Sequence, residues 1–115
     1  MLPAQLAIIV PTFNERQNVG LLVDLVDKAL AGTPWELVFV DDDSPDGTAD
    51  SVRDLALRDP RVRIVHRVGR RGLSSACVEG ILATAAPYVA IMDADLQHDE
   101  TILKTMYDRI PQGDA

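Results

Sequence analysis

Residues 6–48 read LAIIVPTFNERQNVGLLVDLVDKALAGTPWELVFVDDDSPDGT, and this stretch predicts a strand, a helix and a second strand in succession. The run 6–10 is continuously apolar and rich in β-branched residues, which is typical of a strand covered on both faces. Apolar residues then recur at spacings of three and four over residues 19–30, as on one face of a helix. Residues 36–40 repeat the first apolar run. The stretch therefore predicts a β-α-β unit.

The remainder of the chain repeats this arrangement of apolar strands and amphipathic helices. Residues 62–66 and 88–92 read as further strands, and helical patterns begin near Thr48, near Leu73 and at Asp99. Successive β-α-β crossovers predict an α/β fold with a mostly parallel sheet and helices on both faces. We expect the strand order 3-2-1-4, because one ligand can then touch the acidic residues that follow the second and fourth strands.

The composition excludes several classes of protein. The chain has 115 residues, 18 Asp and Glu against 11 Lys and Arg, and a net charge of −7, which fits one domain and disfavours nucleic-acid binding. The single cysteine, Cys77, excludes an intrachain disulfide and a cysteine zinc site. No apolar run reaches the roughly 18 residues of a membrane span, so we expect a soluble chain.

Polar residues gather where each expected strand ends, at residues 11–15, 41–48, 67–72 and 93–98. Ligands of open parallel sheets bind outside the carboxyl ends of the strands, so these four loops predict a binding site. The third loop holds a basic cluster that we expect to neutralise a diphosphate, consisting of Arg67, Arg70 and Arg71.

Asp93 and Asp95 are the sharpest pair in these loops. Two carboxylates one residue apart, leaving an apolar strand, can both reach one hard cation. Mg²⁺ and Mn²⁺ accept one or two carboxylates together with phosphate oxygens and water. The alternative is a solvated turn with a helix cap, which an isolated Asp-x-Asp often forms.

The acidic run Asp41, Asp42 and Asp43 is only partly explained by turn formation around Asp46. Three adjacent carboxylates repel one another unless a cation or hydrogen-bond donors compensate. A carboxylate at a strand end can also accept a hydrogen bond from the ring N–H of a nucleobase. In the first loop, Phe13 is suited to stack on a base. Asn14 and Glu15 have the alternative role of capping and charging the first helix.

Four segments in this order resemble glycosyltransferase family 2, most closely its dolichyl- or polyprenyl-phosphate mannosyltransferase branch. The segments are Val10-Pro11-Thr12-Phe13-Asn14-Glu15, Val40-Asp41-Asp42-Asp43-Ser44-Pro45-Asp46-Gly47-Thr48, Gly72-Leu73-Ser74-Ser75-Ala76 and Met92-Asp93-Ala94-Asp95-Leu96-Gln97-His98. Each motif alone is modest, but four in the right order and spacing are specific. The resemblance covers about residues 6–110.

The resemblance implies a Rossmann-like GT-A fold whose first half binds a nucleotide sugar. Its implied nucleotide-sugar-binding residues are Pro11, Phe13, Glu15, Val40, Asp42, Asp93, Ala94, Asp95 and Gln97. Among these, Asp42 contacts the base with Val40 beside it. Asp93, Asp95 and Gln97 hold Mg²⁺ or Mn²⁺ and the diphosphate. Asp93 and Asp95 are the implied catalytic residues.

The chemistry implied by the resemblance is an inverting sugar transfer. A phosphate oxygen of a polyprenyl (dolichyl) phosphate attacks the anomeric carbon of GDP-mannose or a UDP-sugar, and the nucleoside diphosphate leaves. The metal neutralises charge on the leaving diphosphate. Such an acceptor implies work at a membrane surface, on the cytoplasmic face.

Three departures from the family pattern stand out. Phe13 replaces a common Tyr, which removes a hydroxyl but keeps stacking. Asp43 replaces a usual Gly or Asn and adds negative charge. Family catalytic domains are about twice as long, so we expect residues 1–115 to be a truncated, nucleotide-binding half. Such a half is expected to transfer sugar poorly and to associate through its exposed apolar face.

Two other functional classes remain open from the sequence alone. A nucleotide-sugar-binding module without catalysis fits the short length. A signalling receiver domain is also α/β, but receivers carry paired acids after the first strand, whereas here the acids follow the second and fourth. A dinucleotide oxidoreductase is excluded because no Gly-x-Gly-x-x-Gly follows any strand.

Overall fold

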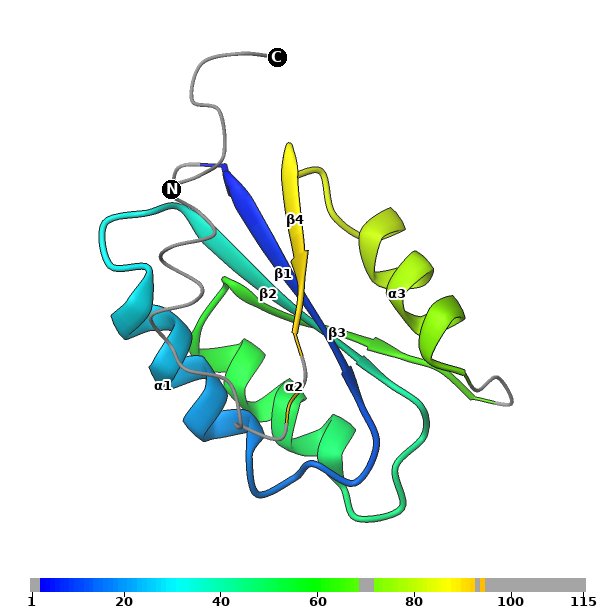
Figure 1. Ribbon diagram of the computed structural model, residues 1–115. Helices are drawn as coiled ribbons and strands as arrows, with labels where there is room; N and C mark the ends of the chain where they lie inside the picture. Colours follow the sequence, from blue (N-terminus) through cyan, green and yellow to red (C-terminus); the bar gives the residue numbers. More distant parts are fainter. Residues whose placement is uncertain (1–2, 69–71, 93, 95–115) are drawn as a thin grey trace.

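The computed structural model describes residues 3–68, 72–92 and 94 of the chain (Figure 1). Its elements alternate as predicted, and the expected fourth helix, from Asp99 onward, lies outside the described residues. The elements are β1 (Leu6–Thr12), α1 (Val19–Ala29), β2 (Trp35–Asp41), α2 (Thr48–Arg58), β3 (Val62–His66), α3 (Leu73–Leu82) and β4 (Tyr88–Ile91).

The four strands form one parallel sheet in the order β3-β2-β1-β4. This confirms the predicted order. The register pairs Thr12 with Asp41 and Asp41 with His66, so β1, β2 and β3 end side by side. Beyond the last residue of β4, the N–H of Met92 donates to the carbonyl of Ile9 over 3.0 Å. The four carboxyl ends therefore meet at one edge of the sheet.

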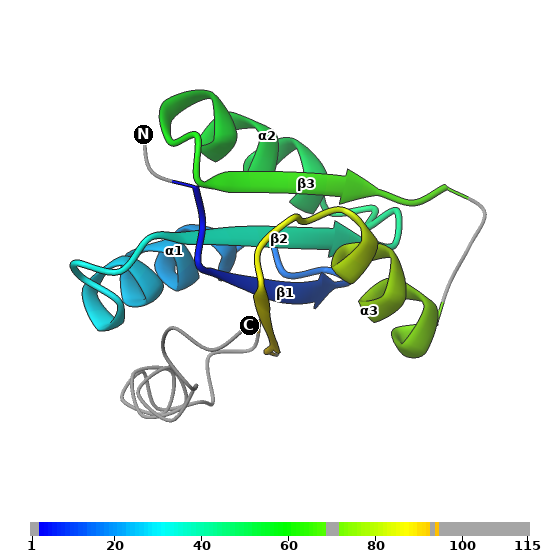
Figure 2. The ribbon, with the colours of Figure 1, turned by 90° about the horizontal axis from the view of Figure 1, so that it is seen from above.

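Helices cover both faces of the sheet, as the continuously apolar strands predict. Figures 1 and 2 show α1 and α2 on one face and α3 on the other. One core cluster joins α1 and α2 to Ile8, Leu37 and Phe39 of the sheet. A second, smaller cluster joins α3, through Ala76, to strand residues that include Ile9.

The close contact between α3 and the sheet depends on Gly80. A Cβ added at Gly80 would lie 2.3 Å from Cγ2 of Ile9 and 3.0 Å from Cγ2 of Val40. Any side chain larger than a hydrogen would therefore push the helix off the sheet. Gly80 therefore permits the close helix–sheet contact.

The part of the chain that the structure describes leaves apolar side chains exposed on α3 and β4. These are Val78, Ile81, Leu82, Val89 and Ile91. Their exposure agrees with the expected apolar face, while self-association through it stays a prediction. Within the same described residues, no helix combines the length and the apolar character that crossing a bilayer requires.

Candidate functional site

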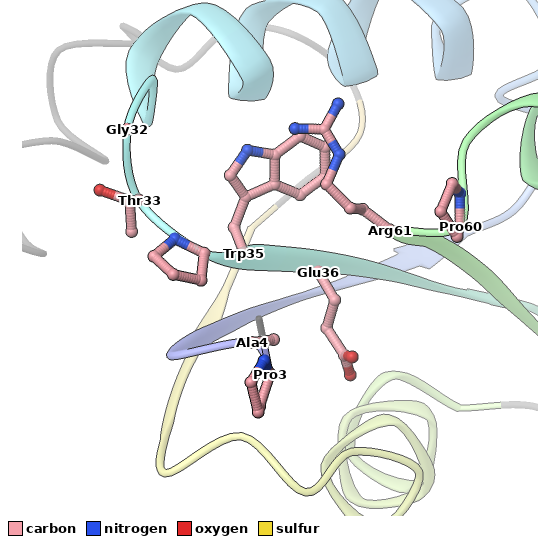
Figure 3. Close-up of a pocket in the computed structure, with 9 residues that line it drawn as sticks. Pro3, Ala4, Gly32, Thr33, Trp35, Glu36, Pro60 and Arg61 are labelled. Carbon is pink, nitrogen blue, oxygen red and sulfur yellow. The ribbon is translucent and has the colours of Figure 1, made fainter. Parts of the chain in front are cut away.

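The candidate site lies at the carboxyl edge of the sheet, where the loops after β1, β2 and β3 meet. A pocket of about 510 Å³ lies at the opposite edge, beside the first residue of β2. Figure 3 shows this pocket, in which Arg61 stacks on Trp35 with its guanidinium 4.0 Å from the ring centre. Because ligands of parallel sheets bind at the carboxyl ends of the strands, we assign the candidate site to the other edge.

Asp41 organises the loop that follows β2. Its side chain is fully buried and accepts hydrogen bonds from the hydroxyls of Thr12 (2.8 Å) and Ser44 (2.6 Å) and from the backbone N–H of Ser44 (2.9 Å). A buried carboxylate with three donors has its hydrogen bonds satisfied within the protein. Asp41 therefore has a structural role, which shapes the loop rather than contacting a ligand.

Asp42 is held by a buried arginine. The guanidinium of Arg67 donates from Nε to Oδ1 of Asp42 over 2.7 Å, and the side chain of Arg67 is 0% exposed. The backbone N–H of Gly72 donates to Oδ2 of Asp42 over 3.3 Å. The Asp42 side chain keeps 15% of its surface exposed, so it remains accessible at the edge of the sheet.

The same guanidinium binds the first two turns of α3. Nη1 of Arg67 donates to the hydroxyl of Ser75 (2.9 Å) and to the carboxylate of Glu79 (2.7 Å), and Nη2 donates to the carbonyl of Gly72 (3.4 Å). A fully buried guanidinium with these partners is not available to a diphosphate. The prediction that Arg67 neutralises a diphosphate is therefore wrong, and its companions Arg70 and Arg71 lie outside the described residues.

The loops after β1 and β2 are joined by three consecutive backbone N–H groups. These donate from Asn14 to Ser44 (2.8 Å), from Glu15 to the hydroxyl of Thr48 (3.0 Å) and from Arg16 to the carboxylate of Asp46 (3.2 Å). Each N–H is satisfied within the protein, so this turn does not offer them to a phosphate. The two loops instead form one rigid unit.

The hydrogen bonds that join these two loops change the pKa of Asp46. Burial acts to raise its pKa, but hydrogen bonds from Thr48 and from the backbone of Arg16 hold the pKa of the Asp46 carboxyl below its ordinary value. The carboxylate accepts from both the N–H and the hydroxyl of Thr48, the first residue of α2. Asp46 thus supports the start of α2 from just before its N-cap residue, Gly47.

The capping alternative for Asn14 and Glu15 is wrong. The residue before α1 is Asn18, and the first turn of the helix contains no acidic residue. Asn14 instead has a left-handed backbone, with φ of 57°, and the carboxylate of Glu15 accepts from the side-chain amide of Asn18 over 2.9 Å. A hollow of about 390 Å³ lies beside the β1–α1 loop and is bordered by Asn14, Glu15, Arg16, Gln17, Asn18 and Asp46.

The residues implied by the family resemblance occupy different environments. Phe13 is 44% exposed, which suits a ring that stacks on a base, while Pro11 and Glu15 are half-buried. Val40 and Ala94 are buried, and they belong to the core clusters on opposite faces of the sheet. The remaining three, Asp93, Asp95 and Gln97, lie outside the described residues. Among the residues that the structure does describe, no cluster of three His, Cys, Asp or Glu side chains is placed to hold a metal ion.

Sequence reasoning missed two groups that hold the acidic run in place. One is the set of contacts of Arg67 with Ser75 and Glu79, described above. In the other, Nε2 of His66 lies 2.9 Å from the carboxylate of Asp43, and Nδ1 of His66 lies 2.9 Å from Nη2 of Arg53. The available signal was positional, since His66 ends the strand that pairs with β2 and Arg67 directly follows it.

The fold has close counterparts among solved structures. The mannosyltransferase PcManGT from Pyrobaculum calidifontis, in complex with GDP-Man and Mn²⁺, superposes with a TM-score of 0.67 and 28% identity over 83% of this chain and 28% of its own. Glucosyl-3-phosphoglycerate synthase from Mycobacterium tuberculosis gives a TM-score of 0.62 at 22% identity, over 80% of this chain and 34% of its own, a likeness of fold. The parallel sheet and its loops thus define the chain as GT-A in class.

Sequence comparison then gives the family. The profile described as "Glycosyl transferase family 2" matches residues 7–115, and the chain belongs to this family. It is 38% identical to a dolichol-phosphate mannosyltransferase of Pyrococcus furiosus, over 95% of this chain and 31% of that protein. It is 39% identical to a dolichol-phosphate mannosyltransferase of Saccharomyces cerevisiae, over 85% of this chain and 38% of that protein. A polyprenol monophosphomannose synthase of Mycolicibacterium smegmatis is 37% identical, over 92% of this chain and 41% of that protein. The chain therefore spans less than half the length of these relatives.

Proposed function

We propose that residues 1–115 are the nucleotide-sugar-binding half of a glycosyltransferase that moves mannose from GDP-mannose to a polyprenyl phosphate. The names of the three curated relatives support the sugar and the class of acceptor. The bound GDP-Man of the Pyrobaculum calidifontis neighbour supports the donor.

One observation carries this proposal, namely that an exposed phenylalanine and an anchored aspartate follow neighbouring strands at the same end of the sheet. The backbone N–H of Asp42 donates to the carbonyl of Thr12 over 3.1 Å, so Asp42 and Phe13 follow neighbouring strands at the same level. An aromatic ring provides a surface for stacking, and a carboxylate accepts from the ring N–H of a purine or pyrimidine. The two side chains together suit a nucleobase, with Pro11 and Glu15 beside them.

The diphosphate and its metal are assigned to the segment after β4. This segment carries Asp93, Asp95 and Gln97, and Met92 directly before it is hydrogen-bonded to Ile9 of β1. Carboxylate and amide oxygens are ligands that Mg²⁺ and Mn²⁺ prefer, and both solved neighbours described above contain Mn²⁺. When bound, the metal would neutralise charge on the leaving diphosphate.

The acceptor chemistry follows from the nature of a phosphate nucleophile. An oxygen of the polyprenyl phosphate attacks the anomeric carbon from the face opposite the diphosphate, so the configuration inverts. The acceptor oxygen is already anionic, which removes the need for a strong general base. Because the acceptor is a lipid, we assign the whole protein to a membrane surface, on its cytoplasmic face.

Calorimetry with GDP and UDP in the presence of Mn²⁺ tests the proposal. Asp42→Asn should weaken GDP binding by roughly 10-fold or more, since a hydrogen bond to a charged group is worth about 1.5–3 kcal/mol. The matched control is Asp54→Asn, which changes an exposed carboxylate on α2. Equal affinity of the Asp42 and Asp54 variants would exclude Asp42 from the base site, and tighter binding of UDP than GDP would overturn the assignment of the donor.

A further inference from the structure

We propose that His66 is a positioning residue for the nucleotide site, because it holds Asp43 in a strained backbone conformation and thereby fixes the neighbouring Asp42. This inference rests on the proposed role of Asp42 in contacting the base. It assigns a function to a histidine that neither the family resemblance nor the capping and turn motifs include.

The first observation is the backbone of Asp43. Its φ is 58°, in the left-handed region that residues with a side chain adopt only at an energetic cost. Asp43 stands where the family pattern has Gly or Asn, the two residues that enter this region most easily. Aspartate also enters this region, less readily than glycine, so a partner for its carboxylate offsets the remaining strain and the added charge.

The second observation is the chain of contacts that reaches Asp43 from α2. Nη1 of Arg53 donates to the carboxylate of Asp50 over 2.9 Å, which orients the guanidinium. Nη2 of Arg53 lies 2.9 Å from Nδ1 of His66. An arginine has only donors, so Nδ1 must accept and the ring proton must be on Nε2. Nε2 then donates to Oδ1 of Asp43 over 2.9 Å.

The third observation links this contact to the site. His66 is the last residue of β3 and Arg67 follows it, and they bind Asp43 and Asp42 respectively. The backbone N–H of Arg67 donates to the carbonyl of Asp41 over 2.8 Å, which continues the parallel pairing. His66 and Arg67, at the carboxyl end of β3, thus hold Asp43 and Asp42, which follow β2. Release of Asp43 would allow the peptide between Asp42 and Asp43 to rotate and would turn the Asp42 carboxylate.

A double-mutant cycle tests the proposal. His66→Ala is measured in the natural chain and in an Asp43→Gly background, where glycine adopts the left-handed backbone unaided and no carboxylate remains for His66 to bind. In the natural chain, His66→Ala should weaken GDP binding about fivefold, a size typical of coupled neighbouring residues. In the Asp43→Gly background the same substitution should leave the affinity for GDP unchanged. An equal loss in both backgrounds, or no loss in either, would overturn the proposal.

Two further measurements separate positioning from general stability and from the proposed function. His66→Gln keeps a side-chain N–H donor and should restore GDP affinity to within about twofold of the natural chain, whereas a loss equal to that of His66→Ala counts against positioning. The NMR amide signal of Asp42, recorded without nucleotide, should move in His66→Ala but not when Asp43→Gly is already present. If the natural chain binds no nucleotide, the proposed function fails. The amide signal alone then supports positioning if it moves as expected and refutes it if it does not.

Discussion

Replacement of the buried Arg67 by methionine provides the most direct test of how the site is built. The guanidinium is 0% exposed and donates to two carboxylates, at 2.7 Å from Asp42 and 2.7 Å from Glu79. Arg67→Met keeps most of the side-chain volume but removes the guanidinium that donates to both carboxylates. Loss of one partner from a buried ion pair typically costs about 3–5 kcal/mol in the free energy of unfolding, because the remaining charges are uncompensated.

The matched control is Arg63→Met, on β3, the strand that ends just before Arg67. Arg63 pairs with Glu36 over 3.1 Å, but the two side chains are 43% and 18% exposed. Removal of an ion pair of this kind should cost below about 1 kcal/mol. Urea denaturation of the natural chain and both variants, followed by circular dichroism, measures the difference as a shift of the midpoint at constant slope.

A third variant separates the charge of Arg67 from its geometry. Arg67→Lys keeps the charge but loses the planar fork that reaches Asp42, Glu79 and Gly72 together, so its midpoint should lie between those of the natural chain and Arg67→Met. If Arg67→Met shifts the midpoint no more than Arg63→Met does, the buried guanidinium does not hold the site together, and the reasoning is refuted.

Three other perturbations have defined outcomes. Gly80→Ala should destabilise the fold by about 1–3 kcal/mol, because the added Cβ overpacks against Ile9. Gly20→Ala has open space around its added Cβ and should stabilise α1 by up to about 1 kcal/mol. Equal effects of the two substitutions on stability would contradict the close approach of α3 to the sheet. Phe13→Ala should weaken GDP binding by roughly 5- to 100-fold, as loss of base stacking does, and Phe13→Tyr should retain it; calorimetry that finds Phe13→Ala unchanged rules out stacking. A hydrogen bond from Arg61 lowers the pKa of Asp59 from its ordinary value of 3.8. The stability that this interaction gives the fold is therefore present above pH 3.8 and is lost as the pH falls through the lowered pKa. Acid titration of unfolding should then show a smaller loss of stability below about pH 4 in Asp59→Asn than in the natural chain.

The strands could be predicted from the sequence because short, β-branched apolar runs between helical patterns are typical of buried parallel strands. The bounds of β3 agree with the apolar run 62–66, but the ends of β1 and β2 could not be predicted. β1 continues to Thr12 and β2 to Asp41, although the apolar runs end at Val10 and Val40. Parallel pairing continues through polar residues when the neighbouring strand supplies the partner, as Thr12 does for Asp41. Periodicity along one strand contains no information about that partner.

The candidate site was predictable in location but not in its internal contacts. The rule for open parallel sheets was sufficient to bring the loops after β1, β2 and β3 to one edge. The burial of Arg67 was not predictable, because its partner Glu79 is 12 residues further along the chain and reaches it only through the packing of α3. In sequence, a basic residue beside acidic loops looks the same whether it binds a diphosphate or holds the loops together. Only its burial in the structure distinguishes these two roles.

The structure also shows how three adjacent carboxylates are tolerated after β2. Repulsion among them requires compensation, and each one obtains it from a different source. Asp41 has hydroxyl and backbone donors within the loop, Asp42 has the guanidinium of Arg67, and Asp43 has Nε2 of His66 at 2.9 Å. Hydrogen-bond donors thus perform the role that a cation would otherwise have. The proposed metal site is therefore kept separate from this run, at the carboxylates that follow β4.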